Sequence, residues 1–199
     1  MGISGYPKFK QYTEAQMPLP TSVPAGTEVF NATFKVKMES DGTRWIPLAP
    51  FFVYVAKLAD EVTGTTDLTL LREITLPHQY IGKNGNIEVF LGSLNNSNAN
   101  TKRIVVSLFD GTTTYDIYNV TSTTTGKTMA KTIQAAGIEY DFYTSGTGAA
   151  TDGLSNSSQN SQALDPALTE LTMRISGQLT DVGDWARLSR LAIKINGGF

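Results

Sequence analysis

From residue 27 onward, apolar and polar side chains alternate one by one along several segments of the chain. The clearest segment is 30–38, where Phe, Ala, Phe, Val and Met occupy every second position and polar residues stand between them. A repeat of two residues is the period of a β-strand with one buried face. We therefore predict a half-buried strand here, and the same pattern predicts strands over 103–108, 115–119, 138–143, 171–176 and 185–195.

Three further segments read as strands, over 45–58, 68–76 and 87–91. Residues 51–56 are apolar on both faces, as in a central strand buried on both sides. Pro47 and Pro50 should confine the early part of that strand to an edge or a bulge, because proline cannot donate to the ladder. The pair Asp110-Gly111 between two β-rich runs predicts a tight hairpin.

These segments amount to about eight or nine strands at intervals typical of an all-β sandwich. Between them the sequence has no stretch of helical period long enough for a parallel crossover connection, so the sheets should be antiparallel. A chain of 199 residues fits one such domain. We predict an all-β fold, an antiparallel two-sheet sandwich over residues 27–199.

Residues 1–26 form a separate segment that holds four of the eight prolines and is predicted to be an extended N-terminal arm. Large apolar and aromatic side chains punctuate the arm at Tyr6, Phe9, Tyr12 and Met17. Such side chains normally cover a surface. They are candidate partner-docking residues, and they either pack on the parent domain or dock onto a neighbouring subunit.

Residues 144–167 are rich in Gly, Ser, Thr, Asn and Gln and have no aromatic residue. The segment cannot bury enough surface by itself to offset its ordering entropy. We expect a long polar loop that is functional, disordered or ordered by a neighbour in an assembly.

Composition excludes several classes of function. The formal net charge is −2 and lysines and arginines are scattered, so the chain lacks the basic footprint of a nucleic-acid-binding protein. It has no cysteine, which rules out disulfides, thiolate zinc sites and cysteine nucleophiles. No segment reaches the roughly 18 consecutive apolar residues of a membrane helix.

The motifs that could carry chemistry are weak. His78 is the single histidine, follows Pro77, and has neither a Gly-x-Ser-x-Gly elbow nor further zinc ligands, so we interpret it as a loop histidine. Gly126-Lys127-Thr128 resembles the end of a phosphate-binding loop, but Thr121 stands where the motif requires glycine. Neither motif predicts a catalytic or nucleotide site.

Two carboxylate pairs are candidates for an acid and its base. Asp60 and Glu61 are adjacent and would point to opposite sides of a strand. Asp181 and Asp184 bracket a turn, where they could also help to hold a calcium ion. A sugar-binding face could be built from aromatic residues, but core or inter-subunit packing is the favoured interpretation for Trp45, Tyr54, Tyr80, Tyr115 and Tyr118. We predict no catalytic residue, no cofactor and no metal.

Two segments carry a family resemblance. Residues 101–113, Thr-Lys-Arg-Ile-Val-Val-Ser-Leu-Phe-Asp-Gly-Thr-Thr, place a basic, β-rich strand before a tight Gly-Thr turn. Residues 171–179, Leu-Thr-Met-Arg-Ile-Ser-Gly-Gln-Leu, precede the turn Gly183-Asp184 and the last strand. With these two segments, and with the Ser/Asn/Gly-rich stretch before the second of them, residues 27–199 resemble the small jelly-roll proteins found among structural proteins of tailed bacteriophages. The arm at 1–26 is not part of the shared pattern.

The resemblance implies a jelly-roll virion component that decorates the head, forms a head or neck fibre, or builds a tail appendage. The expected partners are a major capsid protein or a neck or tail protein, reached through the N-terminal arm, and further copies of the chain, for which a trimer is one expected assembly. The expected location is the virion, assembled in the host cytoplasm. The alternative is a tail-associated receptor-binding module for host surface glycan, and a polysaccharide depolymerase is the third hypothesis.

Overall fold

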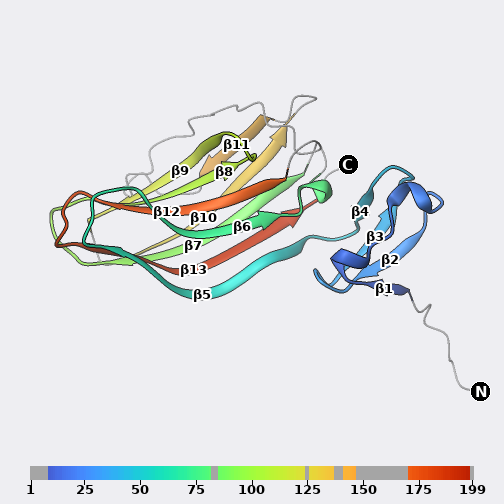
Figure 1. The fold of residues 1–199 in the computed structure, drawn as a ribbon, viewed down its shortest axis with the longest axis horizontal. Coiled ribbons are helices and arrows are strands. Elements are labelled where there is room, and N and C mark those ends of the chain that lie inside the picture. Colours follow the sequence, from blue (N-terminus) through green and yellow to red (C-terminus); the bar gives the residue numbers. More distant parts are fainter. Residues whose placement is uncertain (1–8, 82–84, 124–125, 137–140, 147–169, 198–199) are drawn as a thin grey trace, which may run out of the picture.

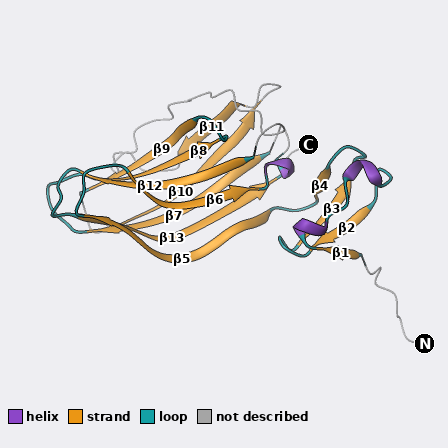
Figure 2. Cartoon of the chain, viewed as in Figure 1, coloured by secondary structure: helices purple, strands orange, loops and turns teal. Residues whose placement is uncertain are grey.

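The computed structural model describes residues 9–81, 85–123, 126–136, 141–146 and 170–197. Strands dominate these residues (Figures 1 and 2), and the helical elements among them are short 3-10 turns, η1 (Glu14–Gln16), η2 (Pro20–Ser22) and η3 (His78–Tyr80). Within the described ranges no helix is long and apolar enough to cross a membrane.

Two antiparallel sheets form the main body (Figure 1). The five-stranded sheet has the order β11-β10-β7-β13-β5, and the four-stranded sheet has the order β6-β12-β8-β9. This arrangement confirms the prediction of an all-β, antiparallel, two-sheet sandwich of jelly-roll type. The strands are β5 (Phe51–Thr63), β6 (Thr69–Leu76), β7 (Asn86–Asn95), β8 (Lys102–Phe109), β9 (Thr114–Ser122), β10 (Gly126–Ala136), β11 (Asp141–Gly146), β12 (Leu171–Leu179) and β13 (Trp185–Asn196).

The core lies between the two sheets. Every second residue points inward and is buried in β7 and in the two parts of β13 that flank Ser189 and Arg190, and the inward residues of β8 and β12 meet them from the other sheet. Alternation therefore arises because each strand has one face in the core and one outside. The buried residues on these four strands include Ile87, Val89, Leu91, Leu191, Ile193, Ile195, Val106, Leu108, Met173 and Ile175.

A third sheet, made of four short strands, precedes the sandwich, and we call residues 10–47 the N-terminal module (Figure 1). Its strands β1 (Lys10–Tyr12), β2 (Glu28–Asn31), β3 (Val36–Ser40) and β4 (Trp45–Pro47) lie in chain order. The described part of the predicted arm, residues 9–26, is thus packed with residues 27–47 rather than separate from them. β1 pairs in parallel with β2, and the Trp45 indole donates a 2.8 Å hydrogen bond to the Pro18 carbonyl. The sheet of the module ends at Pro47, and the first strand of the sandwich begins at Phe51.

The single strand predicted over 30–38 is wrong. The segment is a hairpin in which β2 and β3 pair antiparallel. The Asn31 side chain accepts hydrogen bonds from the backbone N–H groups of Thr33 and Phe34, and Lys35 adopts a positive φ of 54°. Local hydrogen bonding by asparagine therefore turns the chain where the apolar pattern alone continues.

The central position predicted for 51–56 is also wrong. β5 is an edge strand, paired with β13 on one side only. Phe51 is buried, whereas Phe52 and Val55 are 51% and 65% exposed. The expected break near the prolines does occur, since β4 ends at Pro47 and β5 begins at Phe51. The Asp110-Gly111 hairpin is confirmed, because β8 and β9 pair antiparallel around it.

Candidate functional site

The predicted docking residues lie in or next to the N-terminal module. Tyr6 falls outside the described residues. The Lys37 ammonium lies 4.3 Å from the centroid of the Phe9 ring, and Tyr12 and Met17 are partly buried against the core. The three described side chains thus contact their own chain, and their docking onto a neighbour stays a prediction.

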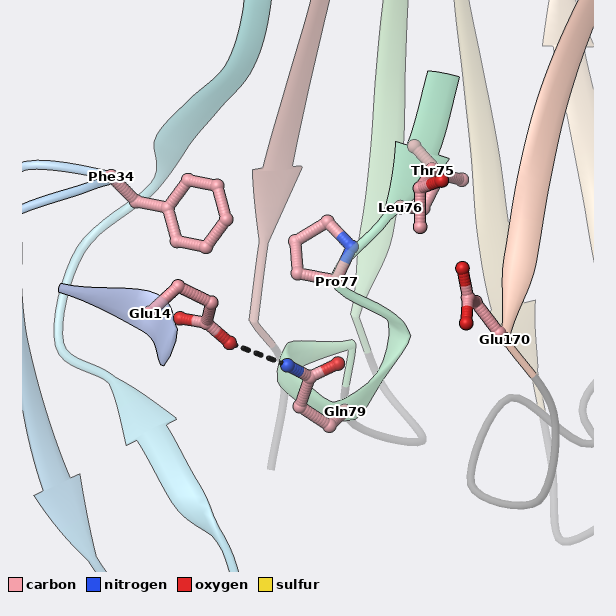
Figure 3. Close-up of a pocket in the computed structure, with 7 residues that line it drawn as sticks. All are labelled: Glu14, Phe34, Thr75, Leu76, Pro77, Gln79 and Glu170. Carbon is pink, nitrogen blue, oxygen red and sulfur yellow. Dashed lines mark hydrogen bonds between the residues drawn. The ribbon is translucent and has the colours of Figure 1, made fainter. Parts of the chain in front are cut away.

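The carboxylate of Glu14 links the module to the sandwich. Glu14 starts η1, where its backbone N–H donates to the Thr33 hydroxyl at 2.9 Å. Its carboxylate accepts hydrogen bonds from Asn31 of the module at 2.6 Å and from Gln79 of η3 at 2.8 Å. The Tyr80 hydroxyl lies 2.8 and 2.9 Å from the two carboxylate oxygens. We call this contact the junction, and Figure 3 shows Glu14 facing Gln79 across it.

Aromatic rings complete the junction. The Tyr80 ring packs edge-on against Phe34 of the module and Phe51 of β5, with centroids 6.2 and 6.1 Å apart, and Phe34 lies 5.1 Å from Phe51. Tyr80 is only 2% exposed. Burial is the main cause that raises the pKa of the Tyr80 phenol, and the negative charge of Glu14 acts in the same direction. This hydroxyl therefore stays a hydrogen-bond donor.

A cleft of about 290 Å³ opens beside the junction. Figure 3 shows Glu14 on one side of the cleft, Pro77 and Gln79 in the middle and Glu170 on the other side. The remaining lining residues are Phe34, Thr75 and Leu76. Because three side-chain donors from the junction hold the Glu14 carboxylate, it links two parts of the fold rather than standing free as a base.

The other predicted candidates are separated. Only the backbone of His78 is described, at the start of η3. Gly126-Lys127-Thr128 begins strand β10 and does not enter a helix. Asp60 forms a 2.7 Å ion pair with Arg72, while the adjacent Glu61 forms a 2.6 Å ion pair with Arg187. The two carboxylates thus have separate structural partners.

Asp184 belongs to a buried polar cluster that the sequence pattern did not predict. Asp184 and Lys102 are each 2% exposed, with a carboxylate oxygen 3.6 Å from the ammonium group. The other carboxylate oxygen accepts hydrogen bonds from Asn96 at 2.6 Å and from Asn98 at 2.5 Å. Lys102 in turn donates to the Asn98 side chain and, at 2.9 Å, to the Asn100 carbonyl.

This cluster gives Asp184 a structural role. The Asn96 hydrogen bond is the largest cause that lowers the pKa of the Asp184 carboxyl, and Asn98 and Lys102 act in the same direction. Asp181 instead accepts a 2.8 Å hydrogen bond from the Gly183 N–H within the turn. In the portion of the chain that the structure describes, no three His, Cys, Asp or Glu side chains converge as a metal site would require.

The aromatic residues that were weighed as a sugar-binding face are packed within the fold wherever their side chains are described. Trp45 and Tyr80 are buried, and Tyr54 and Tyr115 are partly buried against the core. The Tyr115 hydroxyl donates to Asp110 at 3.1 Å. The side chain of Tyr118 lies outside the described residues. The described members of this set therefore serve packing.

Comparisons with known proteins returned little. No family model matches the chain, and no curated protein matches it. A solved structure of the CBM22-1 and GH10 modules of Clostridium thermocellum endo-1,4-beta-D-xylanase 10B, complexed with xylohexaose, is 11% identical, with a TM-score of 0.29. The match covers 74% of this chain and 29% of the xylanase chain. We draw nothing about fold or function from a similarity of this extent.

Proposed function

We propose that this chain is a non-enzymatic structural component of a tailed-phage virion, of the decoration, cement or fibre type, attached through its N-terminal end. The observation that carries the proposal is the position of the N-terminal module at one pole of the sandwich (Figure 1). The turns after β5, β7 and β12 lie at the opposite pole. Attachment through the module would leave the sandwich to project from its support.

The surface of the module supports this proposal. Leu19 is 71% exposed and Leu48, at the end of the module, is also exposed. Exposed apolar side chains gain free energy when a partner covers them. The partner we propose is a capsid, neck or tail protein of the same particle, with further copies of the chain, a trimer first among them, as second partners.

The carboxylates support a structural rather than a catalytic role. Asp60, Glu61 and Asp184 each have a cationic partner within the fold. A glycosidase needs two carboxyl groups that face one scissile bond across a shared cleft. Carboxylates held in separate ion pairs instead stabilise particular strands and turns.

The test is incorporation into particles. A double variant Tyr6→Ala/Leu19→Asp should keep the circular dichroism spectrum of the parent but should be missing from particles purified after infection with the encoding phage. The control is Val182→Asp, which places the same charge on a 60% exposed side chain at the opposite pole and should be incorporated normally. Equal incorporation of the two variants would refute attachment through the module.

A further inference from the structure

A hollow lies on the outer face of the five-stranded sheet, away from both the core and the junction. One cross-strand row forms it, in which Lys57 of β5 pairs with Arg190 of β13, Arg190 with Gly92 of β7, and Gly92 with Thr128 of β10. These four residues and Ser189 line a hollow of about 260 Å³.

A break in the strand register creates the hollow. The register of β13 with both neighbouring strands, β5 and β7, shifts between Leu188 and Arg190. Leu188 and Leu191 are both fully buried, so the two residues between them, Ser189 and Arg190, share the outer face. Such irregularities interrupt ladder hydrogen bonds and are frequent beside functional sites, where they redirect side chains.

Glycine at position 92 allows Ser189 and Arg190 to lie close to strand β7. A Cβ atom there would lie 3.1 Å from the Ser189 hydroxyl oxygen and 3.3 Å from the Arg190 Cβ. These distances are shorter than ordinary van der Waals contact. A side chain on residue 92 would therefore displace Ser189 and Arg190, so the arrangement of these two lining residues depends on glycine.

The charges around the hollow are unbalanced. Like charges directly opposite each other on neighbouring strands repel, and Lys57 and Arg190 occupy such positions. The other cations on this face have anionic partners, since Arg187 pairs with Glu61 at 2.6 Å and Lys194 with Glu88 at 3.2 Å. Among the residues that the structure describes, Lys57 and Arg190 have no anionic partner. An anion placed in the hollow would interact favourably with both.

We infer that the hollow binds the carboxylate of an acidic sugar, a uronic or sialic acid residue. The guanidinium group of Arg190 can hold a carboxylate through two parallel hydrogen bonds. The hydroxyls of Ser189 and Thr128 supply donors and acceptors suited to sugar hydroxyls.

The lining favours a sugar over a carboxylate carried by a protein partner. Protein interfaces have an apolar centre, whereas all lining side chains of this hollow are polar or charged apart from Gly92. A concave site also fits a single ring better than a flat protein surface. The inference does not rest on the proposed virion role, because the hollow lies on the sheet between the two poles of the molecule.

The experiment titrates the full chain with glucuronic, galacturonic and N-acetylneuraminic acids, and with glucose as the neutral sugar. Saturation-transfer NMR measures binding. At least one acidic sugar should bind and glucose should not. Lys57→Gln/Arg190→Gln should weaken the affinity about tenfold or more, since each charged hydrogen bond is worth about 1.5–3 kcal/mol. The matched control Lys10→Gln/Lys35→Gln removes the same charge from the N-terminal module and should leave binding unchanged.

Small anions and an amino acid separate the possible ligands. Acetate and sulfate that bind as tightly as the acidic sugars would show an adventitious ion only and would overturn the inference. N-acetylaspartate binding as tightly would favour a protein carboxylate and would overturn it too, as would failure of all three acidic sugars to bind. Thr128→Val should weaken the sugar but not acetate, because it removes a hydroxyl and keeps both cations.

Discussion

Removal of the Tyr80 hydroxyl tests whether the junction holds the N-terminal module to the sandwich. In Tyr80→Phe the ring keeps its edge-on contacts with Phe34 and Phe51, so the change removes only the hydrogen bond to Glu14. A hydrogen bond to a charged group contributes about 1.5–3 kcal/mol net. Glu14 keeps Asn31 and Gln79 as donors, and we therefore expect a loss near ~1.5 kcal/mol.

The two tryptophans allow the loss to be located. Trp45 lies in β4 of the module and Trp185 in β13 of the sandwich. In a Trp185→Phe background, Trp45 fluorescence during urea unfolding reports the module, while far-UV circular dichroism is dominated by the larger sandwich. Tyr80→Phe should lower the urea midpoint of the fluorescence transition more than that of the dichroism transition.

The control for this experiment is Tyr115→Phe, which removes a hydroxyl that donates to Asp110 in the turn between β8 and β9, outside the junction. It should leave the Trp45 transition unchanged. An unaltered Trp45 midpoint in Tyr80→Phe, or equal shifts in the two variants, would refute the view that this hydrogen bond fastens the module.

Three further predictions concern the sandwich. Gly177→Ala should destabilise it by about 1–3 kcal/mol, because the new Cβ would lie 2.6 Å from the Val62 Cγ1, and Val62→Ala should restore part of the loss in urea unfolding of the double variant. Gly111→Ala should cost about 1–2 kcal/mol in the same assay, since Gly111 has a φ of 94° that an L-residue adopts with strain. The folded-state pKa of Asp184 is lowered, so its stabilising contribution is present above the unfolded-chain pKa of about 3.9 and is lost as the pH falls through the folded pKa. Asp184→Asn should therefore flatten the acid limb of the stability-against-pH curve, and an unchanged limb would contradict this assignment.

Strict alternation predicted the strands that have one face in the core. In β12, Leu171, Met173 and Ile175 are fully buried and the residues between them are not, which is the pattern that the sequence displays. Alternation failed for β10, because Gly126–Ala136 mixes lysine, threonine and alanine without a clear period. β10 is a strand because it pairs along β7, from Gly126 opposite Leu94 to Gln134 opposite Asn86. The sequence of the segment alone does not reveal that partner.

Distant pairing also explains why the buried polar cluster was not predicted. Lys102 begins β8 and Asp184 lies in the turn before β13, and only the folded loops bring them together with Asn96. Likewise, the position of β5 at a sheet edge depends on which strands flank β13. An apolar segment such as 51–56 has the same composition in either position, so the exposure of Val55 could not be predicted from it.

The two poles of the molecule differ in how they are held, and this difference bears on assembly. At the loop pole, Lys102 and Asp184 are fully buried, and their hydrogen bonds tie the β7–β8 loop to the β12–β13 turn. At the module pole, the carboxylate of Glu14 bridges the two units beside a few rings, and residues 48–50 form the covalent connection. A load on the module therefore acts first on the hydrogen bonds of Glu14 and on the rings around Tyr80. Attachment through the module would place this junction between the support and the sandwich.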